Sequence, residues 1–201
     1  MWRNQQRPFQ GLKKWDLHLN NLDRPDLIKY KKKNKKMSNY KGEDRLEKFY
    51  TPKELIDELF LLKDKYCDVQ ITEYLENSAG GGAICDRFDR PYIAFDILPE
   101  PDRLDIKQCD YLKEKIEYKE GRVAMINPPF QKGLKFLYKA LKESDWVFAI
   151  LSQNSLLNID YSKVWVEEIQ LWRKYDFNGT KAGIILVVVR KRKDGDKYEY
   201  E

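Results

Sequence analysis

The sequence has few of the residues that build metal sites and disulfide frameworks. Among 201 residues there is one histidine, His18, and there are three widely separated cysteines, Cys67, Cys85 and Cys109. An odd number of dispersed cysteines is typical of reduced thiols in the cytoplasm and not of a disulfide scaffold or a zinc site. With a single histidine, we expect neither an imidazole base in the core nor a metal site.

Long apolar segments are also missing. No run approaches the roughly 18 residues that a membrane helix needs, and residues 1–30 lack the apolar centre of a secretory signal peptide. The longest run, residues 182–189, has the length and the β-branched composition of a buried strand. Hydrophobic residues make up 42% of the chain, which is enough for one core. We therefore expect a protein without a membrane span, in the cytoplasm, or in the host cytoplasm if a phage encodes it.

Excess positive charge is confined to the first part of the chain. Residues 1–37 carry 11 Lys/Arg and 3 Asp/Glu, whereas residues 38–201 carry 27 and 30. A run of like charges repels itself, stays extended and can bind phosphates by releasing counterions. We interpret residues 1–37 as a basic, flexible arm that is either a solvated tail or a nucleic-acid contact, with Met37 as an alternative native start, and residues 38–201 as the folded domain. The candidate nucleic-acid-binding residues of the arm are Lys31, Lys32, Lys33, Lys35 and Lys36.

Strand-like and helix-like segments alternate along the domain. Thr51 and Pro52, with Glu54 three residues after Thr51, predict a helix N-terminus with Thr51 as its cap. The alternation favours an α/β fold with a mainly parallel sheet. We expect helices at residues 51–62, 83–88, 133–142 and 162–172, and strands at residues 69–75, 92–97, 104–107, 122–126, 146–151 and 183–190.

Polar features follow three successive predicted strands. They are Glu76 with the glycine turn at residues 80–82, then Asp96, then Asp110. In open α/β sheets, ligands bind in the crevice outside the carboxyl ends of the strands. Glycine lets the backbone approach a ligand, and a carboxylate after the second strand can accept from both hydroxyls of a ribose. Cys85 occupies the third glycine position of the dinucleotide fingerprint, which favours a cofactor without a pyrophosphate.

The segment Asn127-Pro128-Pro129-Phe130 follows the fourth predicted strand. Each proline has a fixed φ, and Asn127 is forced into an extended conformation because a proline follows it. The stiff turn offers two acceptors, the Asn127 side-chain oxygen and the Pro128 carbonyl. Two acceptors that hold both hydrogens of a nucleobase amino group would orient its nitrogen for attack, and Phe130 could stack on the base. A proline-rich loop with an aromatic anchor is the structural alternative.

Taken in order, these segments resemble the motifs of the amino-group DNA methyltransferases, most closely the adenine-N6 type of bacteria and phages. The resemblance covers about residues 46–155 and includes Phe49-Tyr50-Thr51-Pro52, residues 75–82, Asp96-Ile97, Asp110-Tyr111-Leu112 and Asn127-Pro128-Pro129-Phe130. It implies a Rossmann-like class I methyltransferase fold, with a mainly parallel seven-stranded sheet and a reversed terminal β-hairpin. It also implies S-adenosylmethionine (SAM) as the cofactor.

The resemblance assigns roles by position. The methionine part of SAM would lie by Tyr50, Thr51, Glu76, Ser78 and Gly80. Asp96 would hold the ribose, and Ile97 beside it would also contact the cofactor. Asp110 would accept from the cofactor's adenine amino group, and Tyr111 would lie against the adenine ring. The target base would be held by Asn127, Pro128, Pro129 and Phe130, with Lys132 as a further nucleic-acid contact.

Some features depart from the family pattern. Asn77 stands where proline is common, only 16 residues separate Asp110 from Asn127, and about 50 follow the fifth predicted strand. These spacings leave no room for a large target-recognition domain, so we do not expect strong sequence specificity, and a protein partner could supply recognition. The segment at residues 154–178 is the remaining candidate for substrate contact, or else a helix that packs Trp165, Ile169 and Trp172 into the core.

The activity expected from the resemblance is direct in-line methyl transfer from SAM to N6 of adenine in DNA. The Tyr50-Thr51-Pro52 segment favours DNA adenine, and RNA adenine is the main alternative. Asn-Pro-Pro-aromatic motifs also occur in enzymes that methylate guanine N2 or a protein glutamine amide. An interpretation of another class is a non-catalytic nucleic-acid-binding or scaffold protein with the same fold. The presence of Glu76, Asp96, Asp110 and Asn127 together disfavours it.

Overall fold

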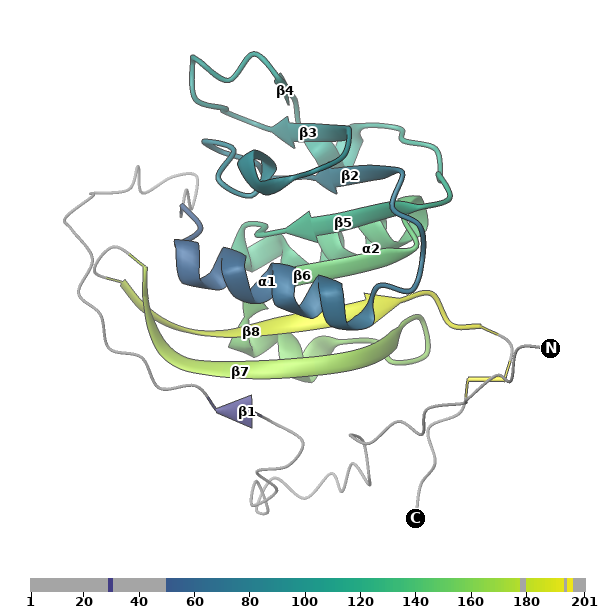
Figure 1. The fold of residues 1–201 in the computed structure, drawn as a ribbon. Helices are drawn as coiled ribbons and strands as arrows, with labels where there is room; N and C mark the ends of the chain where they lie inside the picture. Colours follow the sequence, from purple (N-terminus) through teal and green to yellow (C-terminus); the bar gives the residue numbers. More distant parts are fainter. Residues whose placement is uncertain (1–28, 31–49, 178–179, 194, 197–201) are drawn as a thin grey trace.

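The computed structural model of the chain describes residues 29–30, 50–177, 180–193 and 195–196, which form one sheet with a helix on each face (Figure 1). In chain order the elements are β1 (Lys29–Tyr30), α1 (Lys53–Tyr66), β2 (Glu73–Glu76), β3 (Tyr92–Asp96), β4 (Ile106–Gln108), β5 (Arg122–Ile126), α2 (Gly133–Glu143), β6 (Trp146–Ser152), β7 (Trp165–Phe177) and β8 (Thr180–Arg190). Short 3₁₀ turns connect several of them. No helix among these residues is long and apolar enough to cross a membrane.

The strand order across the sheet is β1-β7-β8-β6-β5-β2-β3-β4. Neighbouring strands are parallel except at β8, which runs antiparallel to both β6 and β7. The two-residue β1 only extends the edge beside β7. Strands β2 to β8 therefore confirm the predicted mainly parallel, seven-stranded sheet with a reversed terminal hairpin.

The two helices cover the two faces of the sheet because the central strands are apolar on both sides. In β6, Ala149 and Leu151 belong to the core on the α2 face, whereas Phe148 and Ile150 belong to the core on the α1 face. All four side chains are 0% exposed. Such double burial is expected of strands in a parallel sheet, where crossover connections place structure on each face.

The expected helix at residues 162–172 is wrong, because this segment lies in strand β7. The apolar residues at positions 165, 169 and 172 have helical spacing, but the register with β8 shifts between Val166 and Glu168. A bulge adds one residue to the strand, so the side chains of Val166 and Ile169 reach the same core although they are three residues apart. The spacing of Trp165, Ile169 and Trp172 that suggested a helix does not mark a shared face, because Ile169 belongs to the core on the α2 face and Trp172 to the core on the α1 face.

Other predicted boundaries need smaller corrections. The helix expected at residues 83–88 is a 3₁₀ turn, Cys85–Arg87, and the first predicted strand begins only at Glu73. Strand β5 has the predicted bounds. The glycine turn and the Asn-Pro-Pro-Phe segment follow β2 and β5, which are direct neighbours in the sheet.

Candidate active site

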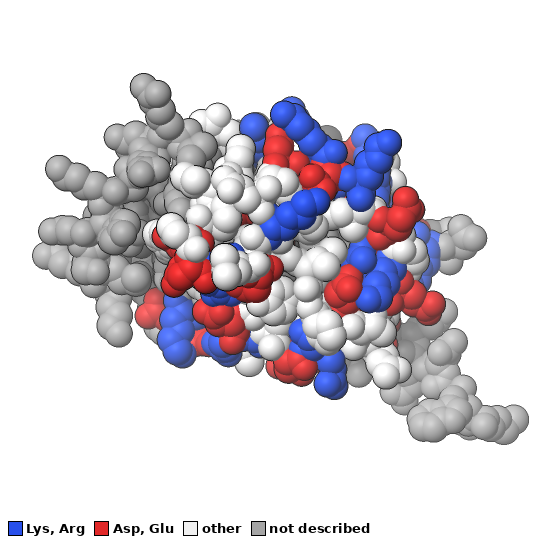
Figure 2. All heavy atoms as spheres, turned by 90° about the horizontal axis from the view of Figure 1, so that it is seen from above, with Lys and Arg blue, Asp and Glu red and all other residues white. Residues whose placement is uncertain are grey.

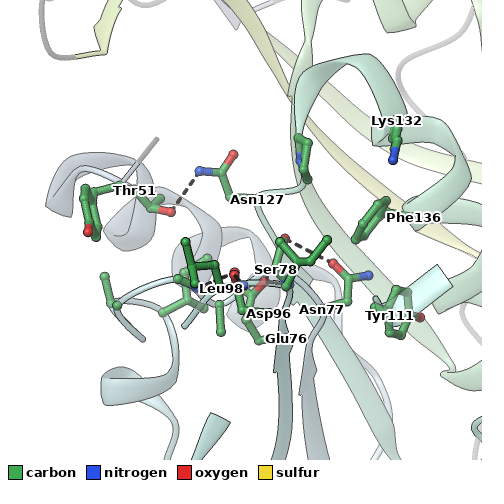
Figure 3. A pocket seen from close by; sticks show the side chains of 18 of the residues that line it. Thr51, Glu76, Asn77, Ser78, Asp96, Leu98, Tyr111, Asn127, Lys132 and Phe136 are labelled. Atoms are coloured by element: carbon green, nitrogen blue, oxygen red, sulfur yellow. Dashed lines mark hydrogen bonds between the residues drawn. The ribbon is translucent and has the colours of Figure 1, made fainter. Parts of the chain in front are cut away.

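A cavity of about 290 Å³ opens at the carboxyl ends of β2, β3 and β5 (Figure 3). Its volume is near the lower end of the roughly 300–1,000 Å³ range of small-molecule pockets. The predicted site residues that line it are Tyr50, Thr51, Glu76, Ser78, Gly80, Asp96, Ile97, Asp110, Tyr111, Asn127, Pro129 and Lys132. The sheet thus brings together residues that are up to 82 positions apart in the sequence.

Asp96 ties the glycine turn to the end of β3. Its Oδ2 accepts from the Gly80 backbone N–H at 2.7 Å, and its Oδ1 accepts from the Leu98 backbone N–H at 2.8 Å. Gly80 has a φ of +54°, in the left-handed region that glycine adopts readily. A carboxylate has about four acceptor positions, so each Asp96 oxygen can still accept from a hydroxyl group.

The loop after β3 holds the glycine turn from outside. The Glu100 backbone N–H donates to the Gly80 carbonyl at 3.2 Å, and Arg103 Nη1 donates to the Gly81 carbonyl at 2.8 Å. At Gly82, whose φ is +81°, an added Cβ would lie 2.0 Å from Arg103 Nη1. Ion pairs from Arg103 to Asp86 and Asp105 orient the guanidinium against the glycine turn.

Glu76 is a buried carboxyl group with one unpaired oxygen at the cavity. Its side chain is 1% exposed, and its Oε1 accepts from the backbone N–H and the hydroxyl of Ser78 at 3.0 and 3.3 Å. Among the described residues, Oε2 has no hydrogen-bond partner, and neither has Nδ2 of the buried Asn77. Burial raises the pKa of Glu76 to about 8, with a further increase from Asp96, against bonds from Ser78 and the Asn127 backbone that lower it. A buried acceptor without a partner is costly unless a ligand satisfies it.

Tyr111 forms a fixed wall of the cavity next to Asp110. Its ring lies between Phe95 and Phe136, with ring centroids 5.7 and 5.5 Å away, and its hydroxyl donates to Glu143 Oε2 at 2.5 Å. Burial, followed by the bond to Glu143, raises the pKa of Tyr111 far above its usual value. The Asp110 side chain accepts from the Leu112 backbone N–H at 3.1 Å, which orients the carboxylate at the end of the loop.

Asn127 lies opposite the glycine turn, at the end of β5. Its Nδ2 donates to Thr51 Oγ1 at 2.9 Å (Figure 3). The expectation that Thr51 caps α1 is therefore wrong: the helix begins at Lys53, its N-cap is Pro52, and no side chain caps it. Thr51 lies one residue before the N-cap position, and its hydroxyl accepts a hydrogen bond from Asn127 instead.

No protein-family model and no curated protein matches this sequence. Solved structures do resemble it. A Pyrococcus horikoshii protein assigned as an RNA methyltransferase has a TM-score of 0.60 at 16% identity, over 77% of this chain and 93% of that one. The 23S rRNA methyltransferase ErmE has a TM-score of 0.54 at 12% identity, over 72% of this chain and 70% of that one. A modification subunit assigned to a type I restriction enzyme of Vibrio vulnificus has a TM-score of 0.52 at 12% identity. This match covers 71% of this chain and 44% of that one.

The chain has the Rossmann-like class I methyltransferase fold. The strand order and the reversed β8 agree with this assignment. Identities of this size establish the fold alone. In this fold, the cavity lies where the resemblance to the amino-group methyltransferases implies the cofactor.

Several residues of this methyltransferase fold lie elsewhere than expected. Pro128 and Phe130 do not line the cavity, and Phe130 packs partly buried against the core on the α1 face. Lys31 to Lys36 lie outside the described residues. Gly81, from the predicted glycine turn, also lines the cavity. The lining residues that sequence reasoning missed are Asn77, Ala79, Ala83, Ile84, Leu98, Cys109, Gln131 and Phe136. Most of them adjoin a predicted motif, and Phe136 could have been found from its position one helical turn after Lys132.

The described residues do not form a continuous basic surface on the face above the β4 edge. Seen from above the β4 edge, Lys and Arg side chains are interspersed with Asp and Glu among the described residues (Figure 2). Within the described part of the chain, no group of three or more His, Cys, Asp or Glu side chains could hold a metal ion. Among the described residues that line the cavity, Lys132 is the only lysine.

Proposed function

We propose that the protein is a SAM-dependent methyltransferase that methylates N6 of adenine in DNA. The observation that supports this most is the single cavity that joins Glu76, Asp96 and Asp110 on one side to the Asn127 amide on the other. The first three match the groups a SAM molecule presents, and the amide matches a target amino group. The methyltransferase fold supports this interpretation but does not identify the substrate.

The cavity residues fit the cofactor. SAM, when bound, supplies an electrophilic methyl group on a sulfonium centre. The unpaired Glu76 Oε2 would accept from the ammonium of the methionine part, which would also favour the ionised carboxylate over the protonated form. The spare acceptor positions of Asp96 would take the ribose hydroxyls, and Asp110 the adenine amino group.

The Asn127 segment would hold the target nitrogen. The Asn127 side-chain oxygen would accept one of its hydrogens and keep it aligned for in-line attack at about 3–3.5 Å. Acceptance of the second hydrogen by the Pro128 carbonyl stays a prediction, since Pro128 lies outside the cavity lining. In a duplex the adenine must first leave the stack, at a cost of a few kcal/mol. Lys132, at the cavity rim, would contact the neighbouring phosphate. Stacking on Phe130 stays a prediction, since that ring lies outside the cavity lining.

RNA adenine is the second candidate substrate. Two of the similar structures are described as RNA methyltransferases, and the described residues contain no separate recognition domain between Asp110 and Asn127. DNA is preferred because the Tyr50-Thr51-Pro52 segment precedes the other motifs in the order of the DNA enzymes. A protein partner that supplies target recognition belongs to the same proposal.

Incubation with tritium-labelled SAM and separate pools of DNA, RNA and protein tests the proposal. We expect label in DNA, recovered after digestion as N6-methyl-2′-deoxyadenosine. We expect no label with Asn127→Ala. Label in RNA would move the assignment to the second candidate. Calorimetry with SAM alone is the companion measurement, and no binding would leave a non-catalytic protein with this fold.

A further inference from the structure

Helix α2 has an outer face on which every exposed side chain is a lysine. The helix lies entirely within the described residues, and its exposed side chains are Lys135 and Lys142. They are seven residues apart, about two turns of a helix, so they project from the same face. Lys132, in the turn before the helix, is also exposed and stands three residues before Lys135. We call Lys132, Lys135 and Lys142 the lysine face of α2.

Two carboxylates close to this helix are already paired. Glu143, the one acidic residue of α2, is 4% exposed and contacts Lys139 and the Tyr111 hydroxyl. The Asp160 carboxylate, on a segment whose backbone contacts α2, pairs with Lys163 at 2.6 Å. Among the described residues, no ion pair involves the lysine face. Its charges are therefore open to an anion from outside the described chain.

Helix α1, on the opposite face of the sheet, carries mixed charges instead (Figure 1). Lys53 pairs with Asp57 one turn away, and such pairs stabilise a helix, whereas lysines alone repel one another. The first turn of α1 contains an acidic residue, Glu54, and that of α2 contains none. Cations near a helix N-terminus oppose the helix dipole. The charges of Lys132 and Lys135 therefore do not serve the stability of α2.

The lysine face begins at the mouth of the cavity. Lys132 and Phe136 line the cavity, and Figure 3 shows them on the same side of it. From Lys132 to Lys142 the chain advances ten residues, which is about 15 Å along a helix axis. Phosphates of one duplex strand are spaced by roughly 3.4 Å along the duplex axis, so the face spans about four of these intervals. The mixed charges seen in Figure 2 belong to the β4 edge, which is a different face.

We propose that the lysine face of α2 binds the phosphate backbone of the DNA strand next to the target adenine. Its charge complements a phosphodiester chain, and its continuity with the cavity places that chain beside the target. The inference rests on the proposed function, because the adenine in the cavity determines which strand passes α2. It adds Lys135 and Lys142 to the single phosphate contact expected of Lys132.

The salt dependence of DNA binding tests this surface. Each lost phosphate contact should make the slope of log K against log salt concentration less steep by about 0.9. Lys132→Gln, Lys135→Gln and Lys142→Gln combined should change it by about 2.7, measured by fluorescence anisotropy with the full chain and a labelled DNA duplex. Lys135→Gln alone should change it by about 0.9, and Lys135→Arg, which keeps the charge, should bind like wild type.

Arg90→Gln is the matched control for charge. Arg90 is exposed, has no ion pair among the described residues and precedes β3, so it lies at the sheet edge opposite the cavity. Its substitution removes one positive charge and should leave the slope as in wild type. A change as large as that of Lys135→Gln would show an effect of net charge and overturn the proposal. Any contribution of Lys31 to Lys36 is common to all variants and cancels.

An unchanged affinity and slope in the triple variant would overturn the proposal even if DNA is methylated. A slope change with an RNA duplex and none with DNA would overturn it as well. Thermal unfolding checks each variant, and Lys135→Gln alone decides if the triple variant does not fold. If wild type labels none of the three pools, the proposed function fails, while the slope still decides whether α2 binds a DNA backbone.

Discussion

Strand β2 begins with Glu73 and ends with Glu76, and the two carboxyl groups differ in their hydrogen-bond partners and in the direction of their pKa shifts. Glu73 accepts from Lys119 Nζ at 2.8 Å and from Arg122 Nε at 2.6 Å. Burial raises the pKa of Glu73, but these two hydrogen bonds outweigh it and the net pKa is lowered. Glu76 has one oxygen without a partner among the described residues, and burial raises its pKa to about 8.

The two ends of the strand therefore serve different purposes. At the end with Glu73, Arg122 also donates to the Glu117 and Glu143 carbonyls, so the buried charges compensate one another within the chain. At the end with Glu76, the matching partner is missing and the cavity is open. An ionisable group with a strongly perturbed pKa in a cavity is a candidate functional group, whereas a fully paired one serves the fold. The comparison predicts that substitutions at the two positions affect different properties.

The largest effect is expected from Glu73→Gln. It leaves Arg122, whose side chain is 8% exposed, without a carboxylate, and breaking a buried pair costs about 3 kcal/mol. Urea unfolding should show this loss, while calorimetry should show an unchanged affinity for SAM. A large drop in SAM affinity with normal stability would reverse the proposed division between the two ends.

Glu76→Gln should have the complementary effect. The amide cannot carry the negative charge that an ammonium group requires, so we expect the SAM affinity to fall about 10–100-fold, or roughly 1.4–2.8 kcal/mol. Isothermal calorimetry near pH 7, where the ammonium group is charged and its approach favours the ionised carboxylate, gives the clearest contrast. The unfolding free energy of the unliganded Glu76→Gln variant should not be lower than that of wild type. A clear loss of stability would instead indicate a purely structural role of Glu76.

The pH dependence of stability should also separate the two glutamates. Because the folded state raises the pKa of Glu76 from 4.5 to about 8, its favourable contribution is complete below pH 4.5 and is lost as the pH rises through about 8. The unfolding free energy of the unliganded protein should decline over this window by at most about 1.4 kcal/mol per pH unit. The difference between wild type and Glu76→Gln removes the contributions of other groups, including Asp96. A difference that does not vary with pH would contradict the raised pKa.

The smallest effect is expected from Asp57→Asn on the surface of α1. Hydrogen bonds from Arg87 and Lys53 lower the pKa of Asp57, but its side chain is 38% exposed and remains accessible to solvent. Exposed ion pairs contribute little to stability because water and salt screen them. We expect unfolding and SAM binding close to wild type, so this variant is the matched carboxylate-to-amide control for the other two. A clear loss of stability would show that pairing alone, without burial, supports this fold.

Much of the fold could be predicted because its signals are local. Residues 123–126 of β5 and 146–151 of β6 are apolar without interruption, and the bounds of β5 were predicted correctly. Strand β7 was not recognised, because Trp165, Ile169 and Trp172 have a helix-like spacing although Ile169 and Trp172 lie on opposite faces of the sheet. The correct periodicity becomes visible only when the strand is aligned with β8.

The candidate site was predictable to a similar degree. Glu76, Asp96 and Asp110 follow successive parallel strands, and such strands end at one edge of a sheet. The pairing of Asn127 with Thr51 was not foreseen, and neither was the position of Phe130 in the core beside α1. Both depend on where α1 packs.

By itself the sequence determined the order of strands β2 to β6 and the polar residues that follow them, because these follow from neighbouring residues and their periodicity. Only the tertiary structure decided which buried groups are paired. Glu73 meets Arg122, 49 residues away, whereas Glu76 has no such partner for its Oε2 among the described residues. Both are glutamates at strand ends, and the difference arises because hydrogen-bond partners are set by the packing of distant segments.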